Sequence, residues 1–312
     1  MKFYDMVIVD SGLDTNSGIN EEVDGLSVQA HRIEPILFGD ISDDWGHGTI
    51  IYHVIRKQFS ECNICVVKLF SKERSTIEDD LIYALRYIKD NIACNVVNLS
   101  LGITICDDIS ELYKACDELA KLGIVIVSAF DNDGCYSFPA AFDNVIGVDS
   151  NNYIRNAGII EYVEGSPINI LAKGNVQRVR LSSSETVIVG GSSVACAYVS
   201  SMLAKEFRGA EISKSKALAF LKTRSHYIYK AGEYCNMFKR EYIIQDVQNV
   251  AVFPVSKEMH AFLRYENMLP FCVRHYYDIR YSGRVGMMLN NLYDGRVGNS
   301  LIEDIEGQAP KP

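Results

Sequence analysis

The sequence lacks any apolar run long enough to cross a membrane, because every hydrophobic stretch is interrupted well before about 20 residues. Its first apolar segment, residues 6–9, follows directly on an acid and is too short for the core of a secretory signal. These absences argue against a membrane-spanning or exported protein. We expect no membrane partner.

A disulfide framework is also missing. The nine cysteines are scattered and odd in number, unlike the paired cysteines of small secreted domains. Cys62 and Cys65 have the spacing of metal ligands, but no second Cys or His pair answers them, and their apolar surroundings favour buried thiols. The sequence therefore predicts a cytoplasmic protein without a metal site at these cysteines.

Clusters of Lys and Arg are absent as well. The formal net charge of −9 is unfavourable for neutralising phosphates, so we expect no nucleic-acid partner. What the chain does have is length and apolar content: 312 residues, 48% of them hydrophobic, suffice for a large buried core.

Short apolar runs alternate with helical segments over the first two thirds of the chain, which is typical of βαβ units. The pattern predicts strands at residues 6–9, 65–70, 96–101 and 124–129, and helices at 77–92, 108–122, 193–207 and 211–223. We therefore expect an α/β fold with a mainly parallel central sheet.

The composition changes near residue 250. Residues 281–286 and 293–298 repeat a motif of tyrosine, glycine, arginine, valine and glycine, which predicts strands entering tight turns. We expect a main domain over residues 1–250 and a small β-rich C-terminal extension over residues 251–312, with a disordered end. The extension is a candidate surface for a protein partner or for self-association.

Two segments carry an acid and a base. Asp10 ends the first apolar strand and is followed by Ser-Gly, a place where functional groups gather in open α/β sheets; a turn or cap role is the alternative. His47 lies between two glycines at the start of a helix-like stretch, which suits a general base that must reach two partners. A plain loop histidine is the alternative.

Two further segments carry a hydroxyl and an amide. Ser193 follows paired glycines at the start of a helix, where backbone N–H groups stabilise negative charge, and Ser192 is the competing hydroxyl. A phosphate-binding loop would need a lysine that is missing here. Asn132 ends a strand as a candidate oxyanion donor or as a turn residue.

Together, these segments resemble the signature blocks of the subtilisin-like serine peptidase family, in the chain order Asp, His, Ser. Residues 10–12, 46–49, 98–102 and 191–195 match the blocks, and the resemblance covers about residues 5–205. It implies a three-layer subtilisin-like fold and a serine endopeptidase.

The resemblance also implies roles for individual residues. Asp10 orients His47, His47 takes the proton of Ser193, and Asn132 with the Ser193 N–H receives the oxyanion. The substrate would bind between two short segments. The residues of these segments are Ser100, Leu101, Gly102, Ala129, Phe130 and Asp131.

Several positions depart from the family pattern. Ala197 replaces the usual proline of the nucleophile helix, which removes no catalytic group. Phe130 and Asp131 replace the usual Ala-Gly, which predicts a bulkier and charged pocket wall. Calcium sites are common in the family, but no compact run of oxygen ligands identifies one here, so we expect no required cofactor.

Four acids fall in segments that border the predicted cleft: Asp43, Asp44, Asp131 and Asp133. Their charge leads to the hypothesis that the enzyme prefers Lys or Arg at P1, although ordinary solvated loop acids explain them too. We expect a dedicated intracellular protease that processes a peptide or protein substrate. The alternatives are a catalytically silent, peptide-binding relative and an unrelated nucleotide-binding domain.

Overall fold

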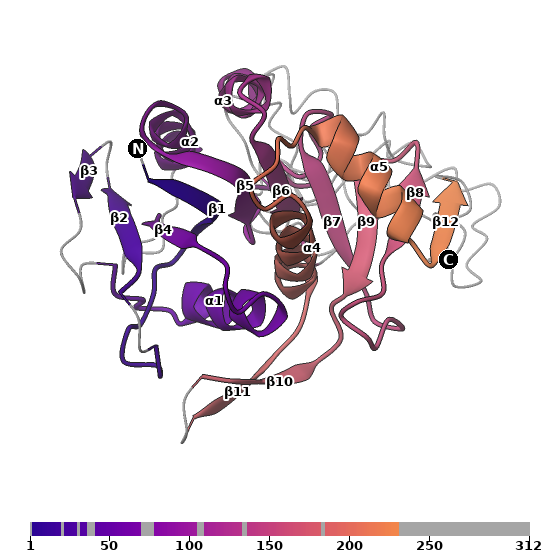
Figure 1. The fold of residues 1–312 in the computed structure, drawn as a ribbon, viewed down its shortest axis with the longest axis horizontal. Helices are drawn as coiled ribbons and strands as arrows, with labels where there is room; N and C mark the ends of the chain where they lie inside the picture. The colour runs from indigo at the N-terminus through magenta and orange to yellow at the C-terminus, as the bar shows by residue number, and fades with distance from the viewer. Residues whose placement is uncertain are drawn as a thin grey trace, which may run out of the picture. The chain divides into compact units, whose positions relative to one another are not determined.

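A ten-stranded sheet forms the centre of the protein (Figure 1). The computed structural model describes residues 2–19, 22–29, 32–35, 41–69, 78–104, 109–132, 136–181 and 185–230. Across the sheet, the strands are β12 (Tyr227–Lys230), β8 (Glu161–Glu164), β9 (Ile168–Lys173), β7 (Ile146–Asn151), β6 (Val125–Ala129), β5 (Ala93–Leu99), β1 (Phe3–Asp10), β4 (Ile64–Lys68), β2 (Asp24–Gln29) and β3 (Arg32–Pro35).

The strands from β9 through β2 in that order are all parallel, and antiparallel pairs occur only towards the two edges of the described sheet. A separate antiparallel hairpin consists of β10 (Gln177–Arg180) and β11 (Thr186–Val189). The expected mainly parallel sheet of an α/β fold is therefore confirmed. The predicted C-terminal extension lies outside the described residues.

Helices cover both faces of the sheet. They are α1 (His47–Gln58), α2 (Glu78–Asn91), α3 (Ile109–Lys121), α4 (Ser192–Glu206) and α5 (Lys214–Arg224). Buried residues of α1, α4 and α5 share one apolar core with the sheet, and α4 packs directly on its central strands. Helices α2 and α3 pack against each other and cover the other face (Figure 1).

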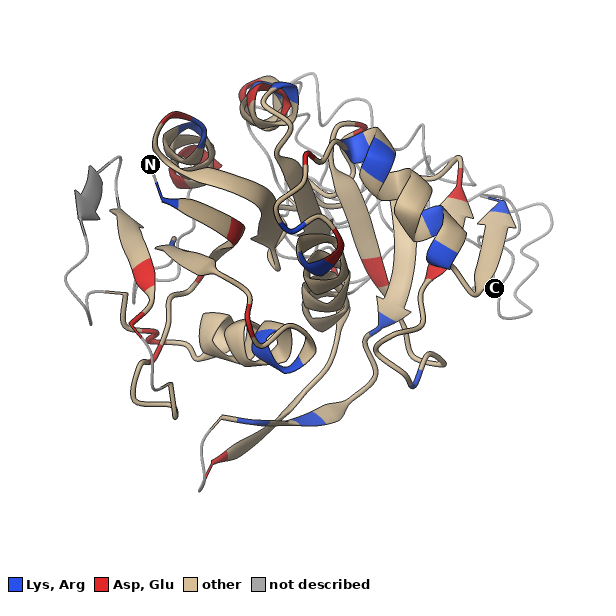
Figure 2. Cartoon of the chain, viewed as in Figure 1, with Lys and Arg blue, Asp and Glu red and all other residues tan. Residues whose placement is uncertain are grey.

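Strand β1 shows why the strands form continuous apolar runs. Met6 and Ile8 point into the core beneath α1 and α4, whereas the alternate residues Val7 and Val9 are equally buried towards the other helix layer. Figure 2 shows the consequence, since the central strands carry few charged residues and the helices carry many.

Candidate active site

The carboxyl ends of the central parallel strands bring the predicted site residues together. Register pairs Val9 of β1 with Leu99 of β5, and Leu99 in turn with Ser128 of β6. The residues that follow, Asp10 and Ser100, therefore lie beside each other where their strands end. This is the edge of an open parallel sheet at which functional groups gather.

Asp10 and His47 form a hydrogen-bonded pair. The Asp10 side chain is fully buried, and its Oδ1 accepts from Nδ1 of His47 at 2.8 Å and from the backbone N–H of Ser11 at 2.7 Å. The His47 side chain, at the start of α1, is 42% exposed. Because Nδ1 donates its proton to the carboxylate, Nε2 is the basic nitrogen of the neutral ring.

The negative charge of Asp10 raises the pKa of His47, burial opposes that shift, and the Asp10 hydrogen bond and the charge of Asp43 add to it. The site therefore stabilises the protonated imidazole. A base that must hold a proton during a reaction needs this property.

Glycine at position 48 lets α1 begin directly against the end of β1. A Cβ there would lie 2.3 Å from the carbonyl oxygen of Gly12 and 3.2 Å from Cβ of Asp10, and the Gly48 N–H donates to Ser11 Oγ at 2.9 Å. A larger residue would force helix and strand apart and separate the imidazole from its carboxylate.

Asp43 caps helix α1. One carboxylate oxygen accepts the backbone N–H groups of Trp45 and Gly46 at 3.0 and 2.8 Å, and the other accepts the N–H and hydroxyl of Thr49 at 2.8 and 2.7 Å. Burial by itself would raise the pKa of Asp43, but the hydrogen bonds from Thr49 and other neighbours hold it below the usual range. Its oxygens are used within the fold.

Two adjacent hydroxyls compete for the nucleophile role, and their environments differ. Ser192 is buried, and its hydroxyl donates to the carbonyl of Phe130. The Ser193 hydroxyl donates to the carbonyl of Ser100 at 2.9 Å, and in the described part of the chain no hydrogen bond joins it to His47. Catalytic hydrogen bonds are often incomplete without substrate, so this geometry is compatible with a nucleophile.

Asn132 is oriented by the start of α4. Its side-chain oxygen accepts the Ser192 N–H at 2.9 Å and lies 3.1 Å from the Ser192 hydroxyl oxygen. Since the oxygen faces the helix, the NH₂ group is left to donate to a ligand. Gly191 makes this approach possible, with a φ of 107° and space so limited that a Cβ would lie 2.5 Å from that oxygen.

The two predicted walls of the substrate site lie against each other. A Cβ on Gly102 would be 3.3 Å from the carbonyl oxygen of Ala129, and the Leu101 carbonyl accepts from the Ser128 hydroxyl at 3.4 Å. Ser100 is buried, whereas Leu101 and Gly102 are at least partly exposed. The backbone of Leu101 and Gly102 is thus accessible at the carboxyl edge of the sheet, next to Ser100.

Phe130 differs from the expectation of a bulky pocket wall. Its side chain is 6% exposed, and the ring packs against Gly147, where a Cβ would lie 2.6 Å away, and edge-on to Tyr136. The bulk lies in the core. Asp131 is half-buried at the end of this segment, and its N–H donates to Ser137 Oγ at 3.0 Å; sequence reasoning missed this buried serine.

The family model described as "Subtilase family" matches residues 9–225. The chain belongs to the subtilase family. It is 28% identical over 161 residues to the minor extracellular protease Epr of Bacillus subtilis, and 27% identical over 182 residues to the major intracellular serine protease of the same species. These alignments cover 47% and 53% of this chain but 23% and 56% of the relatives, so the chain spans less than two thirds of either.

Solved structures support the fold of this subtilase. A cold adapted subtilisin-like serine proteinase superposes with a TM-score of 0.56 at 19% identity, covering 70% of this chain and 80% of the other. At such low identity the likeness shows the fold alone. The expected subtilisin-like three-layer architecture is confirmed.

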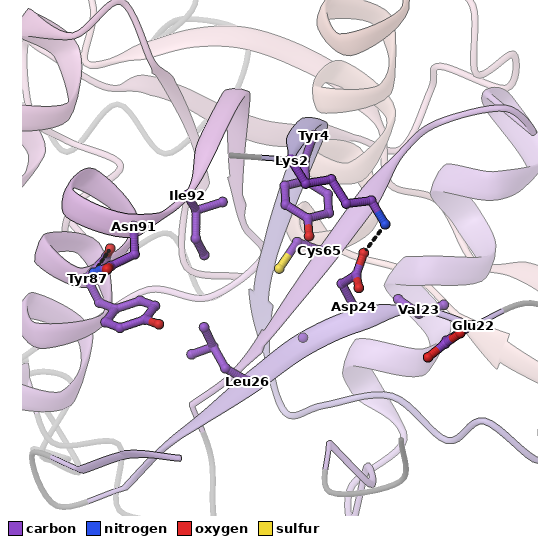
Figure 3. A pocket seen from close by; sticks show the side chains of 11 residues that line it. Lys2, Tyr4, Glu22, Val23, Asp24, Leu26, Cys65, Tyr87, Asn91 and Ile92 are labelled. Atoms are coloured by element: carbon purple, nitrogen blue, oxygen red, sulfur yellow. Dashed lines mark hydrogen bonds and ion pairs between the residues drawn. The ribbon is translucent and has the colours of Figure 1, made fainter. Parts of the chain in front are cut away.

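The opposite, amino-terminal edge of the subtilase sheet contains a hollow of about 280 Å³ (Figure 3). Lys2 and Asp24 form an ion pair at its wall, next to Tyr4 and Cys65. Burial raises the pKa of the Cys65 thiol to about 12, so it is no nucleophile at neutral pH. None of the predicted site residues lines this hollow.

The described cysteines are free thiols in the core: Cys62, Cys65, Cys94, Cys116 and Cys196. This confirms the prediction of buried thiols for the first two. Among the residues described, no three or more His, Cys, Asp or Glu side chains lie close enough to hold a metal ion. None of the described helices is both long and apolar enough to cross a membrane.

Proposed function

We propose that this subtilase is a serine endopeptidase that uses Ser193 as nucleophile, His47 as general base and Asp10 as orienting acid. The observation that carries the proposal is the buried Asp10 carboxylate bound to His47 Nδ1 at 2.8 Å. Asp10 ends β1, and the adjacent strand β5 leads to Ser100, whose carbonyl accepts from the Ser193 hydroxyl. Family membership supports the reaction class.

In this mechanism, Ser193 Oγ attacks the substrate carbonyl and its proton passes to His47 Nε2. Asp10 stabilises the resulting imidazolium, and the Asn132 NH₂ group with the Ser193 N–H binds the oxyanion. The imidazolium then protonates the leaving amine as the C–N bond breaks. Water repeats the sequence on the acyl-enzyme and returns the Ser193 hydroxyl.

The resting hydroxyl of Ser193 must first leave the Ser100 carbonyl. A substrate strand that pairs with the backbone of residues 100–102 supplies an N–H for that carbonyl, because strand addition uses free main-chain groups at an edge. Substrate binding thereby frees the hydroxyl to turn towards His47. The substrate is a peptide or an extended segment of a protein.

The finer role that we propose is peptide processing inside the cell. One relative is named an intracellular protease, and five free core thiols suit a reducing compartment. A preference for Lys or Arg at P1 would use the negative charge of Asp131 or Asp133, the two acids on either side of Asn132 in the sequence. Of the other two acids, Asp43 caps α1, and Asp44 pairs with Lys68 at 3.4 Å.

A panel of peptides that differ only at P1 tests this preference. We expect the wild type to cleave Arg and Lys substrates faster than Leu substrates. We also expect it to cleave Arg and Lys substrates faster than the Asp131→Asn variant does. Equal turnover of Arg and Leu peptides by the wild type would exclude it. Asp133, the fourth acid of the hypothesis, lies outside the described residues.

Covalent labelling with a fluorophosphonate tests the proposed reaction. We expect one adduct per chain, lost in Ser193→Ala and retained in the matched variant Ser192→Ala, whose hydroxyl is buried against Phe130. A folded wild-type protein that takes no label would instead support the catalytically silent, peptide-binding alternative.

A further inference from the structure

Asn98 of β5 has a completely buried polar side chain that bonds to residues of α4. Its NH₂ group donates to Ser100 Oγ at 3.0 Å. Its oxygen accepts from Ser200 Oγ at 2.8 Å and from Cys196 Sγ at 3.4 Å. Buried amides that satisfy both ends in this way fix the elements around them.

The partners of Asn98 follow one face of the helix that begins beside the nucleophile. Ser193, Cys196 and Ser200 are spaced three and four residues apart, so they lie on one side of α4. Asn98 contacts Cys196 and Ser200 directly and reaches Ser193 through Ser100. The register of α4 against β5 is therefore set along two turns of the helix.

The hydrogen bonds also have a direction. Because Asn98 donates to Ser100 Oγ, the proton of that hydroxyl is free to go to the Ser193 carbonyl, 2.9 Å away. The Ser193 hydroxyl donates back to the Ser100 carbonyl, also at 2.9 Å. The amide of Asn98 thus fixes both the backbone of Ser193 and the acceptor of its resting hydroxyl.

We propose that Asn98 is a positioning residue of the reaction, which places Ser193 for attack through Ser100 and holds α4 through Ser200 and Cys196. The inference rests on the proposed function, because it assigns Asn98 to the chemistry of Ser193. A misplacement of about 1 Å at a reacting group can cost on the order of 100-fold in rate.

Adjacent serines on α4 provide a matched test. Ser200 and Ser201 are both buried, and each donates one hydrogen bond. Ser200 donates to Asn98, whereas Ser201 donates to the Ala197 carbonyl within the helix at 2.7 Å. Ser200→Ala and Ser201→Ala therefore remove the same atoms and a comparable hydrogen bond, but only the first touches the Asn98 network.

The measurement is the second-order rate of fluorophosphonate labelling, together with kcat and KM for one peptide. We expect the labelling rate and kcat to fall about tenfold in Ser200→Ala and about 100-fold in Asn98→Ala, with KM nearly unchanged. Ser201→Ala should stay within about twofold of wild type at a similar melting temperature.

Equal losses in the two serine variants, or no loss in either, would overturn the positioning role, even if Asn98→Ala fails to fold. These outcomes are distinct from failure of the proposed function, in which the wild-type chain itself would take no label on Ser193.

Discussion

The two helices that begin at the site, α1 and α4, start in similar ways but differ in the charge of the group at their first turn. Each follows a glycine with positive φ, 77° at Gly46 and 107° at Gly191, and neither glycine offers a capping side chain. Asp43 supplies an anion to the start of α1. At α4 the neutral amide oxygen of Asn132 binds the first N–H instead.

This difference suits two different charges in the reaction. An anion at the start of α1 helps to raise the pKa of His47, which must become a cation. At the start of α4 the reaction develops a negative charge, and a resident carboxylate there would compete with it for the helix N–H groups. Asp43 thus neutralises the start of α1, whereas the N–H groups at the start of α4 remain available for the negative charge that develops in the reaction.

Replacing the neutral amide of Asn132 by an acid should have the largest effect on the reaction. Asn132→Asp keeps the acceptor for the Ser192 N–H but removes the NH₂ donor and adds a negative charge, so we expect kcat to fall about 1,000-fold or more. Asn156→Asp is the control, since the exposed Asn156 uses only its oxygen, for the Gly158 N–H. Comparable losses in both variants would contradict the assignment.

A methyl group at Gly191 should displace the same amide. In Gly191→Ala, the new Cβ would lie 2.5 Å from the Asn132 oxygen, and we expect kcat to fall roughly 10- to 100-fold as the donor moves. Gly165→Ala also puts a side chain at a positive φ, 72°, but with no atom within 4 Å. It should cost about 1–2 kcal/mol of unfolding free energy and leave kcat unchanged; equal kcat values for the two variants would exclude the displacement.

Replacing Asp43 by a neutral residue would leave no charged side chain at the start of α1, as at the start of α4. Asp43→Asn removes a charge that raises the pKa of His47, so the acid limb of kcat/KM should move to lower pH. Asp44→Asn removes the neighbouring charge, which pairs with Lys68, and should leave that limb in place. Identical shifts in the two variants would show that the Asp43 charge has no special role.

The smallest effect concerns stability. The pKa of Asp43 is lowered in the fold, so its stabilising contribution is present above the ordinary aspartate pKa of about 3.9 and is lost as the pH falls through the lowered value. The free energy of unfolding of the wild type should therefore exceed that of Asp43→Asn by about 1 kcal/mol near neutral pH. Chemical unfolding at several pH values checks this; a difference that persists in acid would contradict it.

Much of the fold was predictable because the central strands are buried on both faces. Continuous apolar runs marked β1, β4, β5 and β6, and helical periodicity marked α2 and α3. The other strands of the sheet, β2, β3, β7, β8, β9 and β12, were not predicted, and neither was the hairpin of β10 and β11. The hairpin strands are only four residues each: β10 is mostly polar, and β11 is apolar in sequence but too short to stand out as a buried strand.

The candidate site was predictable in its chemistry but not in its details. The sequence singled out Asp10 and His47, which the structure joins by a hydrogen bond. The residues alone left Ser192 and Ser193 as competing hydroxyls and the family resemblance favoured Ser193; the structure adds that Ser192 is bound to Phe130 across the fold. The sequence also placed Asp43 at the cleft, although an acid shortly before a helix start is a known capping signal. The roles of these residues are decided by contacts in the folded chain, and the spacing of residues in the sequence does not show those contacts.

The most direct test of the account is the pH dependence of fluorophosphonate labelling at Ser193. The probe needs no peptide pocket, so its rate reports how far His47 activates the serine. We expect a rate that rises with pH and has a midpoint above 6.5, the ordinary histidine value, as His47 loses its proton. A labelling rate that is independent of pH, or no labelling at all, would contradict it.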